Sequence, residues 1–155
     1  MQKILRRDLA VSKRRQVKLS LVYFDVDKFK DINDVLGHIK GDEVLRNIGK
    51  AVLNNVRSTD APCRYGGDEF CIILPECGAN DAKDICEKII NEFGERYPDY
   101  FLSIGIAETG LDEYIEGDEL VIIPFLTDAK SRGYAAASIR FGGKPPFALL
   151  GRSLL

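Results

Sequence analysis

The chain has 155 residues, which predicts a single domain large enough to bury a sizeable hydrophobic core. Hydrophobic residues make up 45% and charged residues 30% of it, a balance that excludes a largely disordered protein. The 22 basic and 24 acidic residues leave a net charge of -2, which argues against a general clamp for nucleic acid or anionic lipid. Any phosphate ligand must therefore be held locally.

The sequence also lacks the apolar segments of membrane and secreted proteins. No run reaches the roughly 20 apolar residues that a membrane span needs, and the first residues have no signal-peptide stretch. We therefore expect a cytoplasmic domain that contacts neither a membrane nor nucleic acid.

The four cysteines show no metal-binding spacing. Cys63, Cys71, Cys77 and Cys86 form no CxxC pair, and the single histidine, His38, is distant from them in the sequence. A zinc site is not expected. Three of the four occupy apolar or strand-like positions, so we predict reduced, structural thiols.

Apolar residues at helical spacing, and β-rich runs between turn residues, divide the chain into alternating helices and strands. The predicted helices are, in chain order, 1–16, 29–36, 41–56, 79–97 and 118–131. The predicted strands are 19–25, 62–65, 69–74, 101–107 and 135–141.

Glycine and proline residues mark the breaks between these elements. Gly37 and His38 separate the second helix from the third, Gly66 and Gly67 form the tip of a hairpin, and Pro124 disturbs the last helix. The order predicts an α/β fold of the α+β type, a mixed central sheet covered by helices in a ferredoxin-like arrangement. We expect one domain over 1–155, with its core at 19–141 and an irregular tail at 142–155.

Acidic residues follow one predicted strand and precede another. Asp25 and Asp27 alternate at the end of a buried run, and Asp68 and Glu69 follow the two glycines of the hairpin. If the two strands are neighbours, Asp25 and Asp68 face one another, and such oxygen ligands suit Mg²⁺ or Mn²⁺. The alternative is a solvated acidic turn, the ordinary state of acidic residues on a hairpin. The glycines favour a ligand, because a tip without side chains lets it approach the backbone.

Two motifs make the chain resemble a known family. The segment RYGGDEF at 64–70, with FDVDKFKDINDVLGHIKGDEVL at 24–45, is similar to the GGDEF family of diguanylate cyclases. The resemblance continues more weakly at 101–107 and at Asp128-Ala129-Lys130, and covers about 19–141. It implies a polymerase-palm-like domain that condenses two GTP molecules into cyclic di-GMP and releases pyrophosphate.

The resemblance implies a metal site at the acidic strand ends. Asp25 and Asp68 would bind two Mg²⁺ or Mn²⁺ ions with help from the Val26 carbonyl, and Glu69 would lie near the metal or assist deprotonation. Two divalent cations can activate a ribose 3′-hydroxyl and stabilise the leaving pyrophosphate.

The resemblance also implies a nucleotide site. Asn33 and Asp42 would read guanine, whose N1-H and 2-amino groups a carboxylate can accept. Taken alone, Asn33 reads as a helix-end cap and Asp42 as an acid in the first turn of a helix. The remaining substrate-binding residues that the resemblance implies are Phe29, Lys30, Gly66, Gly67 and Lys130.

An RxxD pattern precedes the hairpin. Arg57 and Asp60 match the family's inhibitory product site, with Lys88 as a second basic contact, because arginine suits phosphate and guanine edges. RxxD alone is a weak pattern and is commonly an exposed helix end.

The sequence departs from the family at two places. No counterpart of the family's DxLTGLxNR segment is found, so we expect a fragment of a larger protein with a fused regulatory domain. Tyr134 stands where the family tends to place a second phosphate-binding arginine, which Arg132 would have to replace. The implied activity needs a transient homodimer, and the alternative function is a non-catalytic module that binds GTP or cyclic di-GMP.

Overall fold

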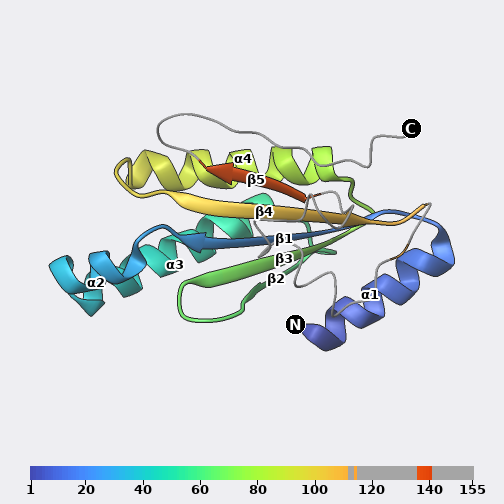
Figure 1. Ribbon diagram of the computed structural model, residues 1–155, viewed down its shortest axis with the longest axis horizontal. Coiled ribbons are helices and arrows are strands. Elements are labelled where there is room, and N and C mark those ends of the chain that lie inside the picture. The colour runs from blue at the N-terminus through green and yellow to red at the C-terminus, as the bar shows by residue number, and fades with distance from the viewer. Residues whose placement is uncertain (112–113, 115–135, 141–155) are drawn as a thin grey trace.

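The computed structural model describes residues 1–111, 114 and 136–140. Helices and strands alternate through this part of the chain much as their periodicity predicts (Figure 1). The elements are α1 (Gln2–Arg15), β1 (Leu19–Val26), α2 (Phe29–Leu36), α3 (His38–Asn55), β2 (Ala61–Arg64), β3 (Glu69–Pro75), α4 (Ala79–Arg96), β4 (Leu102–Thr109) and β5 (Ala136–Arg140).

The strands form one five-stranded sheet in the order β2-β3-β1-β4-β5. The α+β class is confirmed, but every pair of neighbouring strands is antiparallel, so the sheet is not mixed. The connection from β1 to β2 passes over β3, and the connection from β3 to β4 passes over β1. Each pair of parallel strands is therefore separated by an antiparallel one, as in split βαβ units.

β1 occupies the centre of the sheet because nearly every side chain in it is buried. Successive side chains of a strand point to opposite faces. Val22 and Phe24 belong to the core beneath α3 and α4, whereas Leu21 and Tyr23 belong to the core beneath α1. A strand buried on both faces reads as a continuous apolar run, which is what made β1 predictable.

Helices cover both faces of the sheet. Val44 and Ile48 of α3 and Ile89 of α4 pack against one face, and Leu5 and Leu9 of α1 against the other. α1 lies toward one end of the sheet, and α2 and the turn between β2 and β3 lie toward the other (Figure 1). The second end, away from α1, is where the acidic residues meet.

The start of α3 differs from the prediction. The helix begins at His38 and not at Gly41, because the chain is interrupted at Gly37 alone, whose φ is 83°. The Gly37 carbonyl then accepts the amides of Lys40 (3.1 Å) and Gly41 (3.2 Å), so it closes the first turn. His38 therefore lies within the helix.

Several predictions fall on the rest of the chain. The last predicted strand is confirmed as β5. The helix at 118–131 with Pro124, the phosphate contact Lys130, the departure at Tyr134 with Arg132 as its possible replacement, and the tail at 142–155 lie outside the described residues. Within the described residues, no helix is both long and apolar enough to span a membrane.

Candidate active site

The register of the sheet places Glu69, and not the expected Asp68, opposite Asp25. β1 and β3 are neighbours, and Asp25 is the direct cross-strand partner of Glu69. Burial raises the pKa of Asp25, and the nearby charges of Asp27, Asp68 and Glu69 raise it further. The adjoining ends of β1 and β3 thus bring several negative charges close together.

The turn between β2 and β3 is held by its own backbone. The amides of Tyr65 (2.8 Å) and Gly66 (3.3 Å) both donate to the Glu69 carbonyl. The Arg64 guanidinium crosses the turn, and its Nε donates to the carbonyls of Gly66 (3.2 Å) and Gly67 (2.8 Å). These bonds fix the position at which Asp68 and Glu69 leave the turn.

The two glycines of the turn have different surroundings. A β-carbon at Gly66 would run into the Glu69 carboxylate, so the Glu69 side chain occupies the space that Gly66 leaves open. A β-carbon at Gly67 would meet no atom within 4 Å. An alanine at Gly66 would therefore force the end of the Glu69 side chain to move, whereas an alanine at Gly67 would extend into open space.

Asp27 contributes to this end of the sheet although it was not predicted as a site residue. Its amide donates to the Phe101 carbonyl (2.9 Å), and its carboxylate accepts the Ser103 hydroxyl. Both contacts tie the chain after β1 to the start of β4. The alternation of Asp25 and Asp27 was the signal in the sequence, but the partner on β4 could not be read from it.

Tyr23 is a second residue that the sequence analysis missed. It precedes Asp25 by two positions, so it shares a face of β1 with Asp25. Burial and the nearby Glu69 carboxylate raise its pKa well above its ordinary value, so Tyr23 remains a neutral phenol beside the acidic residues.

The predicted guanine readers lie where α2 meets α3. A β-carbon at Gly41 would be 3.1 Å from the Phe29 ring and closer still to the Asn33 side-chain oxygen. Gly41 therefore allows Phe29 and Asn33 to pack against α3. Asp42, next to Gly41, is exposed, as is Lys30 at the start of α2.

The RxxD residues form a closed turn. Arg57 donates to Asp60 through its amide (2.7 Å) and guanidinium Nη2 (2.9 Å), and also to the Pro75 carbonyl (3.1 Å). The Asp60 side chain is fully buried, whereas the Arg57 side chain is 52% exposed. Arg57 and not Asp60 is therefore presented to a ligand in this conformation, and Lys88 is exposed on α4.

The oxygen donors at the acidic strand ends determine which metal ion the site could hold. No group of three or more His, Cys, Asp or Glu side chains within the described residues forms a ready metal cage. Mg²⁺ does not need one, because it commonly keeps several waters and takes one or two carboxylates and the phosphates of its substrate. Asp25 and Asp68, with the Val26 carbonyl, fit that description, and a cation would relieve the repulsion that raises the pKa of Asp25.

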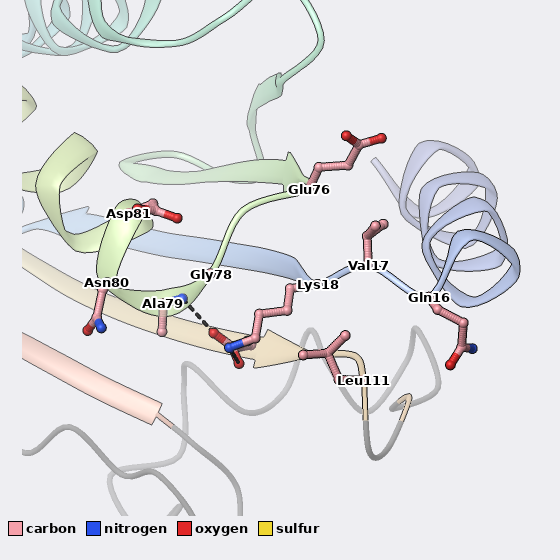
Figure 2. Close-up of a pocket in the computed structure, with 10 residues that line it drawn as sticks. Gln16, Val17, Lys18, Glu76, Gly78, Ala79, Asn80, Asp81 and Leu111 are labelled. Carbon is pink, nitrogen blue, oxygen red and sulfur yellow. Dashed lines mark hydrogen bonds and ion pairs between the residues drawn. The ribbon is translucent and has the colours of Figure 1, made fainter.

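The described residues also form hollows at both ends of the sheet. A groove of about 370 Å³ runs between α2 and the chain before β4, and Asp27 and Lys28 line it. A hollow of about 630 Å³ lies at the other end of the sheet (Figure 2). There Glu108 pairs with Lys18 (2.9 Å) and accepts the Ala79 amide (2.6 Å).

Fold and site together define a class of protein, an antiparallel α+β domain that presents carboxylates and a diglycine turn at adjoining strand ends. The family model described as diguanylate cyclase, GGDEF domain, matches residues 1–133, and the chain belongs to this family. It is 48% identical over 86 residues to diguanylate cyclase DosC of Escherichia coli K12, covering 56% of this chain and 19% of DosC. The chain thus spans about a fifth of that relative's length.

Solved structures show the same fold. The GGDEF domain of YfiN from Pseudomonas aeruginosa matches with a TM-score of 0.73 and 30% identity, covering 86% of this chain and 88% of that one. The GGDEF domain of DgcB from Caulobacter crescentus, solved in complex with c-di-GMP, matches with a TM-score of 0.72 and 27% identity. That match covers 84% of this chain and 82% of DgcB's.

Proposed function

We propose that this domain condenses two molecules of GTP into cyclic di-GMP and releases pyrophosphate. The observation that carries the proposal is the convergence of Asp25, Asp68 and Glu69 at one end of the sheet. Membership of the diguanylate cyclase GGDEF family supports it.

The proposed guanine site is the junction of α2 and α3. Asn33 packs against Gly41, and the residue after Gly41 is the exposed Asp42, so both side chains can face one base. A carboxylate accepts the N1-H and 2-amino groups of guanine, whereas adenine would leave these protein groups unpaired. Lys30 would contact the phosphates, and Phe29 would line the pocket.

Asp25, Asp68 and the Val26 carbonyl would hold Mg²⁺ or Mn²⁺. When bound, the metal lowers the pKa of the ribose 3′-hydroxyl and offsets charge on the leaving pyrophosphate. The Glu69 carboxylate lies in the space beside Gly66, and from there it assists deprotonation of that hydroxyl. Gly67 lets the triphosphate approach the backbone of the turn.

Each protomer would hold one GTP, so the product requires a transient homodimer. A two-fold encounter brings the 3′-hydroxyl of each nucleotide to the α-phosphate of the other.

Product inhibition would use the turn at Arg57. DgcB has been solved with c-di-GMP, which supports recognition of the product within this family. The half-exposed Arg57 suits a phosphate or a guanine edge, Asp60 orients it, and Lys88 would add a second cation. A fused regulatory domain is proposed because the matching relatives are several times longer than this chain.

The proposal is tested by incubating the chain with GTP and MgCl₂ and measuring cyclic di-GMP by mass spectrometry. Asp68→Ala should lower turnover by roughly 100-fold or more, because a metal-holding carboxylate is lost. Asp84→Ala, which removes an exposed carboxylate of α4, is the matched control and should retain turnover. Undiminished product from folded Asp68→Ala would contradict the proposal.

A further inference from the structure

Two cysteines lie opposite one another on the strands that carry the diglycine turn. Cys63 of β2 and Cys71 of β3 are direct cross-strand partners, and their Sγ atoms are 2.6 Å apart. All four cysteines of the chain are free thiols. The sequence predicts structural thiols but not this pairing, because the two residues lack a motif spacing.

The backbone at this position suits a disulfide. Directly opposite residues in an antiparallel pair have Cα atoms about 4.5–5.5 Å apart, within the range of about 4.4–6.8 Å that disulfides span. The sulfurs would have to approach by less than 1 Å to reach the bond length of about 2.05 Å. The register of the two strands is therefore compatible with the bond.

The two pairs of cysteines differ in reactivity. A hydrogen bond from the Cys71 thiol lowers the pKa of Cys63 to about 7, and Cys63 is partly exposed. Burial instead raises the pKa of Cys77 to about 11 and that of Cys86 to about 12. Thiolates are the nucleophiles of thiol oxidation, so Cys63 is the preferred point of attack.

We propose that Cys63 and Cys71 are a site of reversible oxidation, forming a disulfide that clamps the hairpin carrying Asp68 and Glu69. The oxidant is a hydroperoxide, and a dithiol reverses the reaction. This inference does not depend on the proposed cyclase activity, since it concerns the thiols and the hairpin alone.

The reaction with hydrogen peroxide balances in two steps. The Cys63 sulfur attacks one peroxide oxygen and the O–O bond breaks, which leaves a sulfenic acid on Cys63 and releases one water. The Cys71 sulfur then attacks the Cys63 sulfur and displaces hydroxide, which takes the Cys71 proton and leaves as a second water. Two thiols are oxidised to one disulfide as one peroxide is reduced to two waters.

A disulfide between Cys63 and Cys71 would restrict the motion of the turn that carries the acidic residues. Cys63 and Cys71 flank the turn, whose amides bond to the Glu69 carbonyl. A cross-link there removes open conformations of the hairpin, so exchange of the Tyr65 amide with solvent should slow about threefold or more.

The test begins with the reduced wild-type chain, which is treated with hydrogen peroxide, then denatured and alkylated before proteolysis. Peptide mapping should give one cross-link, between Cys63 and Cys71, which dithiothreitol removes. Cys77 and Cys86 should be alkylated in full. Hydrogen exchange of the same samples should show the slowed Tyr65 amide in the oxidised form only.

Variants separate the pair from the other thiols. Cys77→Ser and Cys86→Ser should keep the cross-link, whereas Cys63→Ser should lose it and its Tyr65 exchange should no longer respond to peroxide. Over-oxidation of Cys63 without a cross-link, a cross-link to Cys77, or unchanged exchange in the cross-linked wild-type chain would each overturn the inference. The wild-type mapping requires no variant, so a variant that fails to fold leaves the test intact.

Discussion

The Asp25 carboxylate lies where its charge is unfavourable in the free domain. Burial, followed by the charges of Asp27, Asp68 and Glu69, raises its pKa in the folded state. The folded chain therefore holds the Asp25 proton more tightly than the unfolded chain, whose pKa is about 3.9. Ionisation of Asp25 therefore destabilises the fold. The free energy of unfolding falls as the pH rises from about 3.9 through the folded pKa, and it loses no more above that pKa.

Replacing this carboxylate should stabilise the metal-free domain. We expect Asp25→Asn to raise the free energy of unfolding at neutral pH by up to about 1 kcal/mol, since solvent screens part of the repulsion. Urea unfolding between pH 4 and 7 measures this, and the gain should shrink toward the acidic end. MgCl₂ should raise the Tm of the wild type more than that of Asp25→Asn. A less stable variant at neutral pH would contradict this account of the acidic end.

The two glycines of the turn should respond differently to alanine. Gly67→Ala should fold with wild-type stability but bind GTP at least about tenfold more weakly, because its methyl group occupies the space assigned to the ligand. Gly66→Ala should displace the Glu69 carboxylate and lower kcat. Thermal unfolding and steady-state kinetics of both variants measure these effects. Wild-type kinetics for Gly67→Ala would show that no ligand approaches there.

At the scale of elements, the sequence predicted what depends on local pattern. The apolar run of β1 and the periodic stripes of α3 and α4 identified the core, because one face of a helix and both faces of a central strand must be buried. The sequence also predicted that β1 and β3 are neighbours, but it placed Asp68 opposite Asp25, where the register places Glu69. What could not be predicted depends on contacts across the chain: the bond from Ser103 to Asp27, the burial of Asp60 and the pairing of Cys63 with Cys71.

Helix α3 supplies a matched pair of glycines, Gly41 beside α2 and Gly49 in its middle. Alanine in a helix interior normally adds up to about 1 kcal/mol of stability over glycine, and Gly49→Ala should gain it because its β-carbon meets nothing within 4 Å. Gly41→Ala should not gain this stability, because its methyl group collides with Asn33, and for the same reason it should raise the KM for GTP. Chemical denaturation and GTP titration measure both effects. An unchanged KM for Gly41→Ala would remove Asn33 from the guanine site.

The turn before β2 combines a structural and a proposed regulatory role. Arg57→Ala removes the guanidinium from the buried Asp60 carboxylate, which keeps its bond to the backbone amide of residue 57. The variant should therefore lower the free energy of unfolding by about 1–3 kcal/mol. The same variant should weaken inhibition by cyclic di-GMP at least about tenfold, because the exposed cation is lost. Urea unfolding and inhibition curves check the two effects. Full inhibition of Arg57→Ala would place the product site elsewhere.

At the scale of the whole molecule, one domain can supply only half of the proposed reaction. Asp25 and Glu69 pair where β1 ends and β3 begins, and this end of the sheet lies away from α1 (Figure 1). If two such ends meet, specific activity should rise with protein concentration until the dimer saturates.

The most direct test is therefore the stoichiometry of the reaction, measured over a series of protein concentrations with GTP and MgCl₂. The proposed function predicts two GTP consumed and two pyrophosphates released for each cyclic di-GMP, with a specific activity that rises with protein concentration. GTP binding without pyrophosphate release, or release of GDP and phosphate in its place, would contradict it.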